Sequence, residues 1–391
     1  MHLSNRITTL TADGADGWEV FYKARRMIAD GVPVTELTIG EHDIRTAAPV
    51  LQEMHRSALG GHTGYAMVPG TDDLRDIVAA RCAARTGVPT TRDNVLITPG
   101  GQSALFAAHA AACDPGDVAL YVDPYYATYP GTIRAVSAIP RAVAARAEDG
   151  FQPRGSDIAA AADGATSLLI NTPNNPTGVV YSDKTLTSVA EACVTHDLWL
   201  ISDEVYDTQV WDGAHLSPRA LPGMVDRTLV VGSMSKSHAM TGSRCGWLIG
   251  PEEAIAHLIN LATHTTYGVP GFIQDAAGFA LSQGPVFEAK ISAPFLRRRA
   301  LAQDILGAQN TIGLVPAQGA MYLMLDIRPT GLSGEAFAHA LLDQHHIAVM
   351  PGESFGNAAA GFIRVAMTIE DDAFANALRT LVTFAQAQIT R

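Results

Sequence analysis

The sequence has few charged residues, few cysteines and no long apolar run, and each shortage excludes a class of protein. Only 17% of the 391 residues are charged and 47% are hydrophobic, which excludes a disordered chain. No apolar run approaches the roughly 20 residues that span a bilayer, so we expect no membrane partner. The four cysteines are scattered and form no CxxC pair. This spacing excludes the common zinc sites and a disulfide scaffold, and it favours a reducing cytoplasm.

Positive charge is also scarce. The chain has 27 Lys and Arg against 39 Asp and Glu, a formal net charge of −12. This acidic field repels phosphate backbones and anionic membranes, so we expect no nucleic acid partner. Lysine occurs only at positions 23, 184, 236 and 290. Few side chains are therefore candidates for any role that needs a primary amine.

Apolar runs that alternate with helical stretches predict a parallel sheet. The runs are continuous, as expected of strands buried on both faces, and the helical stretches between them act as crossovers. A compact domain stops growing near ~250–300 residues, so the length predicts a second, smaller domain. The predicted strands are residues 95–98, 118–122, 167–170, 198–201 and 228–231, and the predicted helices are 102–113, 128–138 and 183–196.

The rest of the chain shows a different pattern. Residues 245–249 read as a strand that follows a loop too short for a helical crossover, so we expect it to be antiparallel. From about residue 285 onward, strands and helices mix over a short span, which predicts a small α+β domain on which a helix at 18–29 packs. Its predicted elements are a helix ending near 309, strands at 321–327, 347–350 and 362–367, a helix at 333–345 and a last helix after 370.

Polar residues follow each predicted strand, at the edge where ligands bind in parallel sheets. Residues 98–103 (TPGGQS) place two glycines at a helix start, where free N–H groups attract an anion. Residues 123–130 (DPYYATYP) offer aromatic rings for stacking, and residues 171–178 (NTPNNPTG) offer amide side chains. Each segment alone could equally be a turn or ordinary core packing.

The last two strand ends carry charged groups. Asp203 directly follows a buried run, where a carboxylate is costly unless it is paired. Lys236 lies in residues 233–238 (SMSKSH), and Arg244 follows among hydroxyl groups as an anion partner. Together the five strand ends suit a ligand with a phosphate, an aromatic ring, a ring hydroxyl, a protonatable ring nitrogen and an aldehyde. Pyridoxal 5′-phosphate has all five.

Residues 233–246 (SMSKSHAMTGSRCG) resemble the lysine signature of the class I/II aminotransferases, a pyridoxal-phosphate family of fold type I. Residues 174–178, 203–206 (DEVY) and 362–365 (FIRV) fit the same family in the same order, so the resemblance covers nearly the whole chain. Cys245 differs from the lysine signature of the family, which prefers an aliphatic residue at this position. Residues 200–206, 235–242 and 326–333 are, within this family, most similar to bacterial arginine–pyruvate transaminases.

The resemblance implies a fold and an assembly. The fold would be α/β, with a mostly parallel seven-stranded sheet flanked by helices and a smaller α+β domain. Residues 46–289 would form the large domain, and residues 1–45 and 290–391 the small one. The protein would be a homodimer in which Tyr65 reaches the phosphate bound by the neighbouring subunit.

The resemblance also implies roles for the residues of the site. Lys236, Asp203 and Tyr206 would be the catalytic group. Lys236 would form a Schiff base with the cofactor aldehyde, and Asp203 would keep the ring nitrogen protonated. Asn175 and Tyr206 would hydrogen-bond the phenolic oxygen of the ring, and Tyr126 would stack on it. The residues that would hold the phosphate are Gly101, Gln102, Ser233, Ser235 and Arg244.

Arg364 would bind the substrate α-carboxylate, with Asn175 and Gly40 close by. The competing interpretation of Arg364 is a salt bridge to an internal carboxylate. The family usually has Glu-Pro-Asp after this glycine, whereas residues 41–43 here are EHD, so His42 leaves the loop beside the substrate undefined. Dicarboxylate-specific relatives place an arginine where this chain offers His264.

The implied reaction is a ping-pong transfer of an amino group from an α-amino acid to a 2-oxo acid. One alternative on the same scaffold is a carbon–sulfur β-lyase. The other is a non-enzymatic sensory module, as in regulators that fuse this fold to a DNA-binding domain. No helix-turn-helix segment precedes the fold here and the charge is acidic, so the sensory module fits less well.

Overall fold

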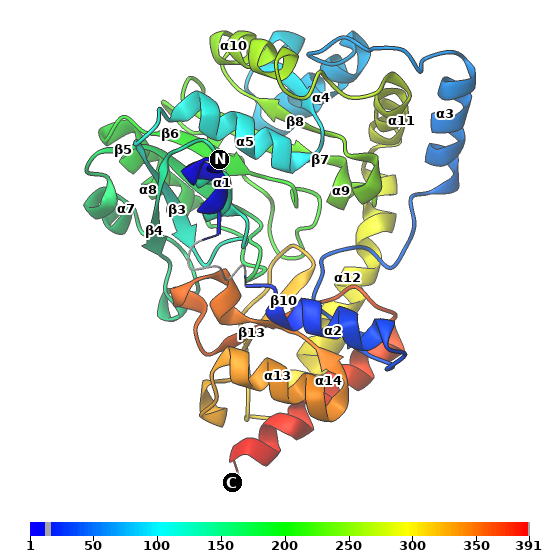
Figure 1. Ribbon diagram of the computed structural model, residues 1–391, viewed down its shortest axis with the longest axis vertical. Coiled ribbons are helices and arrows are strands. Elements are labelled where there is room, and N and C mark those ends of the chain that lie inside the picture. The colour runs from blue at the N-terminus through cyan, green and yellow to red at the C-terminus, as the bar shows by residue number, and fades with distance from the viewer. Residues whose placement is uncertain (12–16, 390–391) are drawn as a thin grey trace.

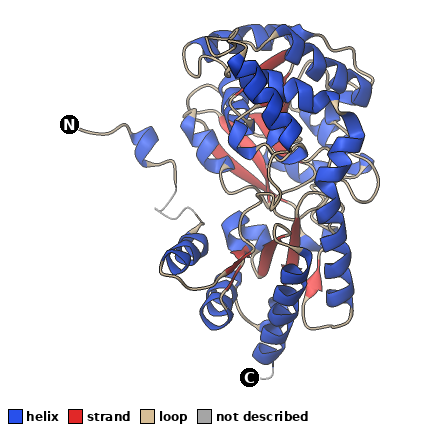
Figure 2. Cartoon of the chain, turned by 90° about the vertical axis from the view of Figure 1, so that its right-hand side faces the viewer, coloured by secondary structure: helices blue, strands red, loops and turns tan. Residues whose placement is uncertain are grey.

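The computed structural model describes residues 1–11 and 17–389, which form a seven-stranded and a four-stranded sheet, each packed with helices (Figures 1 and 2). The larger sheet has the order β2-β8-β7-β6-β5-β3-β4, and only β8 runs antiparallel to its neighbours. The α/β class with a mostly parallel sheet is therefore confirmed. Its strands are β2 Val95–Thr98, β3 Val118–Asp123, β4 Ile139–Ala144, β5 Ala165–Asn171, β6 Trp199–Asp203, β7 Thr228–Ser233 and β8 Gly246–Ile249.

Helices cover both faces of this sheet. Successive strand residues point to opposite sides, so Leu168 and Ile170 lie in one hydrophobic core and Leu169 lies in another. This burial on two faces explains why the strands appear in the sequence as continuous apolar runs. On one face lie α5 Gly101–Ala112, α6 Tyr129–Ala135 and α10 Glu252–Thr263, and on the other lie α4 Asp72–Thr86, α7 Gly155–Ala161, α8 Asp183–Thr195 and α11 Gly271–Ser282.

The smaller sheet is antiparallel, with the order β12-β13-β10-β9. The long helix α12 (Gly284–Gly307) runs from the larger sheet to the core of the smaller one (Figure 1). The predicted domain boundary at residue 289 falls inside this helix, and the division into domains stays a prediction. The other elements here are β9 Gly313–Leu314, β10 Tyr322–Asp326, β12 Met350–Pro351, β13 Phe362–Ala366, α2 Glu19–Ala29, α13 Gly334–His345 and α14 Asp371–Ile389, beside the parallel pair β1 Thr35–Glu36 and β11 Ile347–Ala348.

Three elements differ from the predictions. The edge strand β4 was not predicted, because Pro140 and Arg141 interrupt its apolar residues and leave no continuous run. The helix predicted at 128–138 is shorter, because Ser137 adopts a positive φ of 67° after α6 ends. The strand predicted at 347–350 is divided between β11 and β12, which pair with different partners. Within residues 1–11 and 17–389, none of the helices has the length and apolarity to cross a membrane.

The remaining helices are short or peripheral. α1 (Asn5–Thr8) belongs to the N-terminal segment, which projects to one side in Figure 2 and contacts α6, where Arg134 donates to the Leu10 carbonyl at 3.0 Å. α3 (Ala48–Leu59) packs on α11. α9 (Met234–Ser237) follows β7 directly and carries Lys236 into the space between the two sheets.

Candidate active site

The strand ends of the larger sheet face the smaller sheet across a cavity of about 270 Å³. Every site residue predicted from the sequence lines this cavity except Tyr65. The larger sheet contributes the residues at the ends of β5, β6 and β7, whereas β10 and β13 of the smaller sheet contribute Tyr322 and Arg364. The carboxyl ends of parallel strands meet at one edge, which explains why residues far apart in sequence converge here.

Lys236 is the only one of the four lysines in this cavity. Ser233 ends β7 and caps α9, because its hydroxyl accepts a hydrogen bond from the Ser235 N–H at 3.1 Å. Lys236 is half-buried, and its Nζ donates a hydrogen bond to the carbonyl of Gly40. The other lysines lie elsewhere: those at 184 and 290 are exposed, and the one at 23 forms a 2.5 Å ion pair with Asp343.

Asp203, the last residue of β6, is buried at the floor of the cavity. The Tyr129 hydroxyl donates to its Oδ2 at 2.7 Å, and the Val205 N–H donates to its Oδ1 at 3.3 Å. Burial raises the pKa of Asp203 to about 6, although both hydrogen bonds act in the opposite direction. No cation of the described residues forms an ion pair with this carboxylate. A cationic group bound in the cavity would therefore stabilise its ionised form.

The start of α5 forms an anion site with Arg244. Gly100 precedes the helix with φ of 79°, and a Cβ there would collide with the Arg244 guanidinium. Only glycine therefore lets that guanidinium lie against the helix start. Arg244 also donates to the Thr241 carbonyl at 2.9 Å, and Ser235 lies on the same wall. Backbone N–H groups, hydroxyls and a guanidinium here suit a phosphate.

Arg364 is held on the opposite wall, in the middle of β13 and only 1% exposed. It donates to Asn175 Oδ1 at 2.8 Å and to the Thr38 carbonyl, and its plane lies between the rings of Tyr322 and Phe355, each 4.4 Å from the guanidinium carbon. Its Nε has no hydrogen-bond partner among the described residues. None of their carboxylates pairs with it either, so the internal salt bridge is not observed.

Sequence reasoning missed several residues of this site. Tyr129 belongs to the aromatic run at 123–130, but nothing in the sequence distinguishes it from its neighbours as the donor to Asp203. Tyr322 comes from the smaller sheet, and its hydroxyl lies 3.1 Å from that of Tyr206. A Cβ at Gly40 would collide with the Tyr322 hydroxyl, so the close approach requires glycine.

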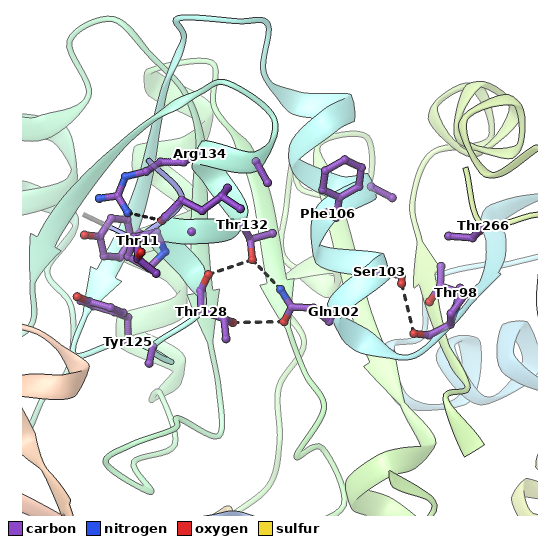
Figure 3. A pocket seen from close by; sticks show the side chains of 18 of the residues that line it. Thr11, Thr98, Gln102, Ser103, Phe106, Tyr125, Thr128, Thr132, Arg134 and Thr266 are labelled. Carbon is purple, nitrogen blue, oxygen red and sulfur yellow. Dashed lines mark hydrogen bonds between the residues drawn. The ribbon is translucent and has the colours of Figure 1, made fainter. Parts of the chain in front are cut away.

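Gln102 lines both this cavity and a larger one of about 970 Å³. Its Nε2 donates to Thr132 Oγ1 at 2.6 Å, and its Oε1 accepts from Thr128 Oγ1 at 3.3 Å (Figure 3). Thr128 directly precedes α6 and Thr132 lies within it, so the amide is fixed between α5 and α6. Trp18 also lines both cavities.

Tyr65 lies outside the cavity of its own chain. Its side chain is 91% exposed, and its ring packs edge-on against Tyr267 with ring centres 5.1 Å apart. Tyr267 is itself half exposed. Among the described residues, no three His, Cys, Asp or Glu side chains are grouped closely enough to hold a metal ion.

Known proteins resemble the chain over nearly all of its length. The family model for aminotransferase class I and II matches residues 32–381. The arginine–pyruvate transaminase AruH of Pseudomonas aeruginosa is 40% identical over 97% of each chain. The aspartate/prephenate aminotransferase of Thermus thermophilus is 32% identical over 91% of this chain and 92% of that protein. Among solved structures, the aspartate aminotransferase from Thermus thermophilus with maleate has a TM-score of 0.91 at 30% identity, covering 98% of this chain and 100% of that one.

These relatives are aminotransferases, and neither a β-lyase nor a sensory module is favoured by them. The coverage includes both sheets and every residue of the cavity from residue 32 onward. The chain therefore belongs to the class I and II aminotransferase family and is a transaminase.

Proposed function

We propose that the cavity binds pyridoxal 5′-phosphate and that the chain uses it to move an amino group from an α-amino acid to a 2-oxo acid. When bound, the cofactor supplies a protonated ring that draws electrons from the α-carbon of the amino acid. The donor set supports this cofactor, because a lysine, a buried carboxylate and an anion site of N–H, hydroxyl and guanidinium groups face one cavity.

The residues of the chain place the reacting groups. Lys236 would attach the cofactor and later carry the α-proton on its Nζ, which the Gly40 carbonyl orients. Asp203 would hold a proton on the ring nitrogen, and Tyr129 fixes the carboxylate for that contact. Asn175 accepts from Arg364 through its Oδ1, which leaves its Nδ2 as a donor for the cofactor's phenolic oxygen.

The observation that carries the proposal is Arg364. A fully buried guanidinium without a carboxylate partner is costly unless an anion binds to it. An α-carboxylate offers two oxygens that match the fork of the guanidinium. Arg364 and Lys236 line the same cavity, so a carboxylate bound at Arg364 brings the amino group of the substrate near the lysine.

Arginine and pyruvate are the first substrate pair to test, because a 40% identical relative is named for them. The experiment is a screen of the twenty standard amino acids against pyruvate and 2-oxoglutarate with the cofactor-loaded protein. A transaminase needs both substrates for turnover. A β-lyase would instead release pyruvate and ammonia from a sulfur amino acid without any acceptor. If no amino acid gives turnover with either 2-oxo acid, the proposal fails.

A homodimer with shared sites is also part of the proposal. Tyr65, Met67 and Tyr267 expose large apolar surfaces, and Tyr65 packs on Tyr267 at the edge of its own chain. His264 lies in the same exposed segment as Tyr267. A second protomer would cover these side chains, and Tyr65 of the first protomer would then reach the anion site of the second. The four cysteines are free and buried, which supports a reducing cytoplasm as the location.

A further inference from the structure

A buried carboxylate at the end of β3 holds a loop of the smaller sheet. Asp123, the last residue of this strand, is 4% exposed. Its Oδ2 accepts a hydrogen bond from the Asn357 N–H at 3.0 Å, and its Oδ1 accepts one from the Ala358 N–H at 3.2 Å. Both donors lie at the start of the 3₁₀ turn η8 (Asn357–Ala359), between β12 and β13. The two sheets are thus joined at this point.

Residues next to Asp123 and next to Asn357 also hold this loop against the end of β3. The Tyr125 N–H donates to the Phe355 carbonyl at 2.9 Å. Gly356 has φ of 115°, and a Cβ there would collide with the Asp123 carboxylate, so the loop backbone lies directly against that group. No Lys, Arg or His of the described residues forms an ion pair with Asp123. Among the described residues, the hydrogen bonds that its carboxylate accepts come from this loop.

Phe355, at the start of this loop, contacts the guanidinium of Arg364. The ring of Phe355 covers one face of it at 4.4 Å, and the ring of Tyr322 covers the other face at the same distance. A planar guanidinium can bind a carboxylate with two hydrogen bonds only when its plane is correctly oriented. The position of Phe355 therefore affects how Arg364 presents its fork.

We propose that Asp123 is a positioning residue for the substrate carboxylate, because it fixes residues 355–358 and, through Phe355, the plane of Arg364. The inference rests on the proposed role of Arg364. Asp123 does not line the cavity, so it acts only through the loop. A buried charge without a cation costs stability that a neutral residue would not. Its hydrogen bonds to two N–H groups offset that cost, because bonds to an ionised acceptor are the stronger kind.

The test compares two isosteric variants, one at the last residue of β3 and one at the residue that precedes the strand. Asp123→Asn keeps the shape but replaces one acceptor oxygen by an NH₂ donor that faces an N–H group. The matched control is Asp117→Asn, because Asp117 also accepts a backbone hydrogen bond, from the Asp114 N–H at 2.8 Å, but directly precedes β3 at the end away from the smaller sheet. The first measurement is amide hydrogen exchange of residues 355–358 in the cofactor-loaded protein. We expect exchange to accelerate on the order of 10-fold in Asp123→Asn only.

The second measurement separates positioning from simple structural support. With the best amino acid from the screen, we expect Asp123→Asn to raise KM about 10-fold and to change kcat less than about threefold, because Lys236 and Asp203 are untouched. Phe355→Leu should raise KM in the same way. If Asp123→Asn does not fold, this variant still tests whether Phe355 orients Arg364. Unchanged loop exchange, or faster exchange with an unchanged KM, overturns the inference. If no amino acid is converted by the wild type, the proposed function fails, and the exchange result still decides whether Asp123 holds the loop.

Discussion

The hydroxyl of Tyr129 donates a hydrogen bond to the Oδ2 of Asp203 at 2.7 Å. Tyr129 opens α6 and Asp203 ends β6, so the contact joins a helix on one face of the sheet to a strand end. Burial raises the pKa of Tyr129 well above its usual value, so this phenol remains a donor at any physiological pH. The carboxylate therefore has a fixed orientation before any ligand binds.

Replacing Tyr129 by Phe should raise the pKa of Asp203 further. The hydrogen bond from the phenol favours the ionised carboxylate, and it is the main effect that opposes burial. We expect kcat/KM to fall about 10- to 100-fold, because loss of a hydrogen bond to a charged group costs roughly 1.5–3 kcal/mol. The carboxyl pKa can be followed by infrared spectroscopy of the cofactor-free protein with labelled aspartate, with Asp203→Asn identifying the band. A carboxyl that titrates as in the wild type contradicts this role of Tyr129.

Asp203→Asn should stabilise the cofactor-free protein at alkaline pH. Burial raises the pKa of Asp203 from 3.8 to about 6, so the folded state holds the proton more tightly than the unfolded state does. This stabilisation by the bound proton is complete below pH 3.8, the carboxyl pKa of the unfolded state, and it is lost as the pH rises through about 6. At about pH 8 the variant should be more stable by up to about 3 kcal/mol, and the difference should vanish near pH 4. Denaturant unfolding across this range is the measurement, and a less stable variant at pH 8 is the contrary result.

Most of the larger sheet was predictable because its strands are buried on both faces. That burial produces the continuous apolar runs of β2, β3, β5, β6 and β7, and a short loop after β7 indicated the antiparallel β8. The edge strand β4 was not predictable, because Pro140, which an edge position tolerates, and Arg141 interrupt its apolar residues. The long helix α12 likewise carries no signal for where one domain ends, since it continues through the expected boundary.

Strand ends predicted the part of the site that the larger sheet carries, whereas Arg364 and Gly40 were predicted only through the family resemblance. Asp203, Lys236 and Asn175 follow three strands of one parallel sheet, so topology alone brings them together. Tyr322 lies in β10 of the smaller sheet and Phe355 ends a 3₁₀ turn beside it, and no periodicity in the sequence encodes how these elements dock. Their contacts with Arg364 therefore emerged only from the structure.

Lys236 should carry the cofactor as a covalent adduct. It is the only lysine that lines the cavity, whereas those at 184 and 290 are exposed and that at 23 is paired with Asp343. Borohydride reduction of the loaded protein followed by peptide mapping should place the pyridoxyl label on Lys236. In Lys236→Ala the label should be absent while the cofactor still binds reversibly, because the anion site is intact. A label on any other lysine contradicts the assignment.

Hybrid dimers should recover activity if the sites are shared between protomers. Mixing Tyr65→Phe protomers with Lys236→Ala protomers gives heterodimers with one intact site and one site that lacks both groups. Partial activity should therefore reappear after subunit exchange, because Tyr65 is too exposed to serve the cavity of its own chain. Mass spectrometry of the intact hybrids verifies the exchange. Verified hybrids without any activity would mean that each site is built within one chain.

Arg364→Lys should reduce activity without preventing folding, because lysine keeps the charge but loses the fork and the stacking between two rings. We expect kcat/KM for every accepted amino acid to fall about 10²-fold, on the order of 3 kcal/mol, with normal cofactor absorbance. An amine without a carboxylate should react equally fast with both proteins. The matched control is Arg219→Lys. Arg219 is also 1% exposed and donates to Thr90 at 2.9 Å, but it does not line the cavity.

The two arginine variants separate substrate binding from structural support. Both lose contacts that a buried guanidinium makes, so both should lower the melting temperature by several degrees. Only Arg364→Lys should also lower kcat/KM, because only Arg364 shares a cavity with Lys236. The loss should appear for amino acids and disappear for amines, since the missing contact is to the carboxylate. If Arg364→Lys lowers the melting temperature and leaves kcat/KM near that of the wild type, the arginine is structural and the substrate carboxylate binds elsewhere.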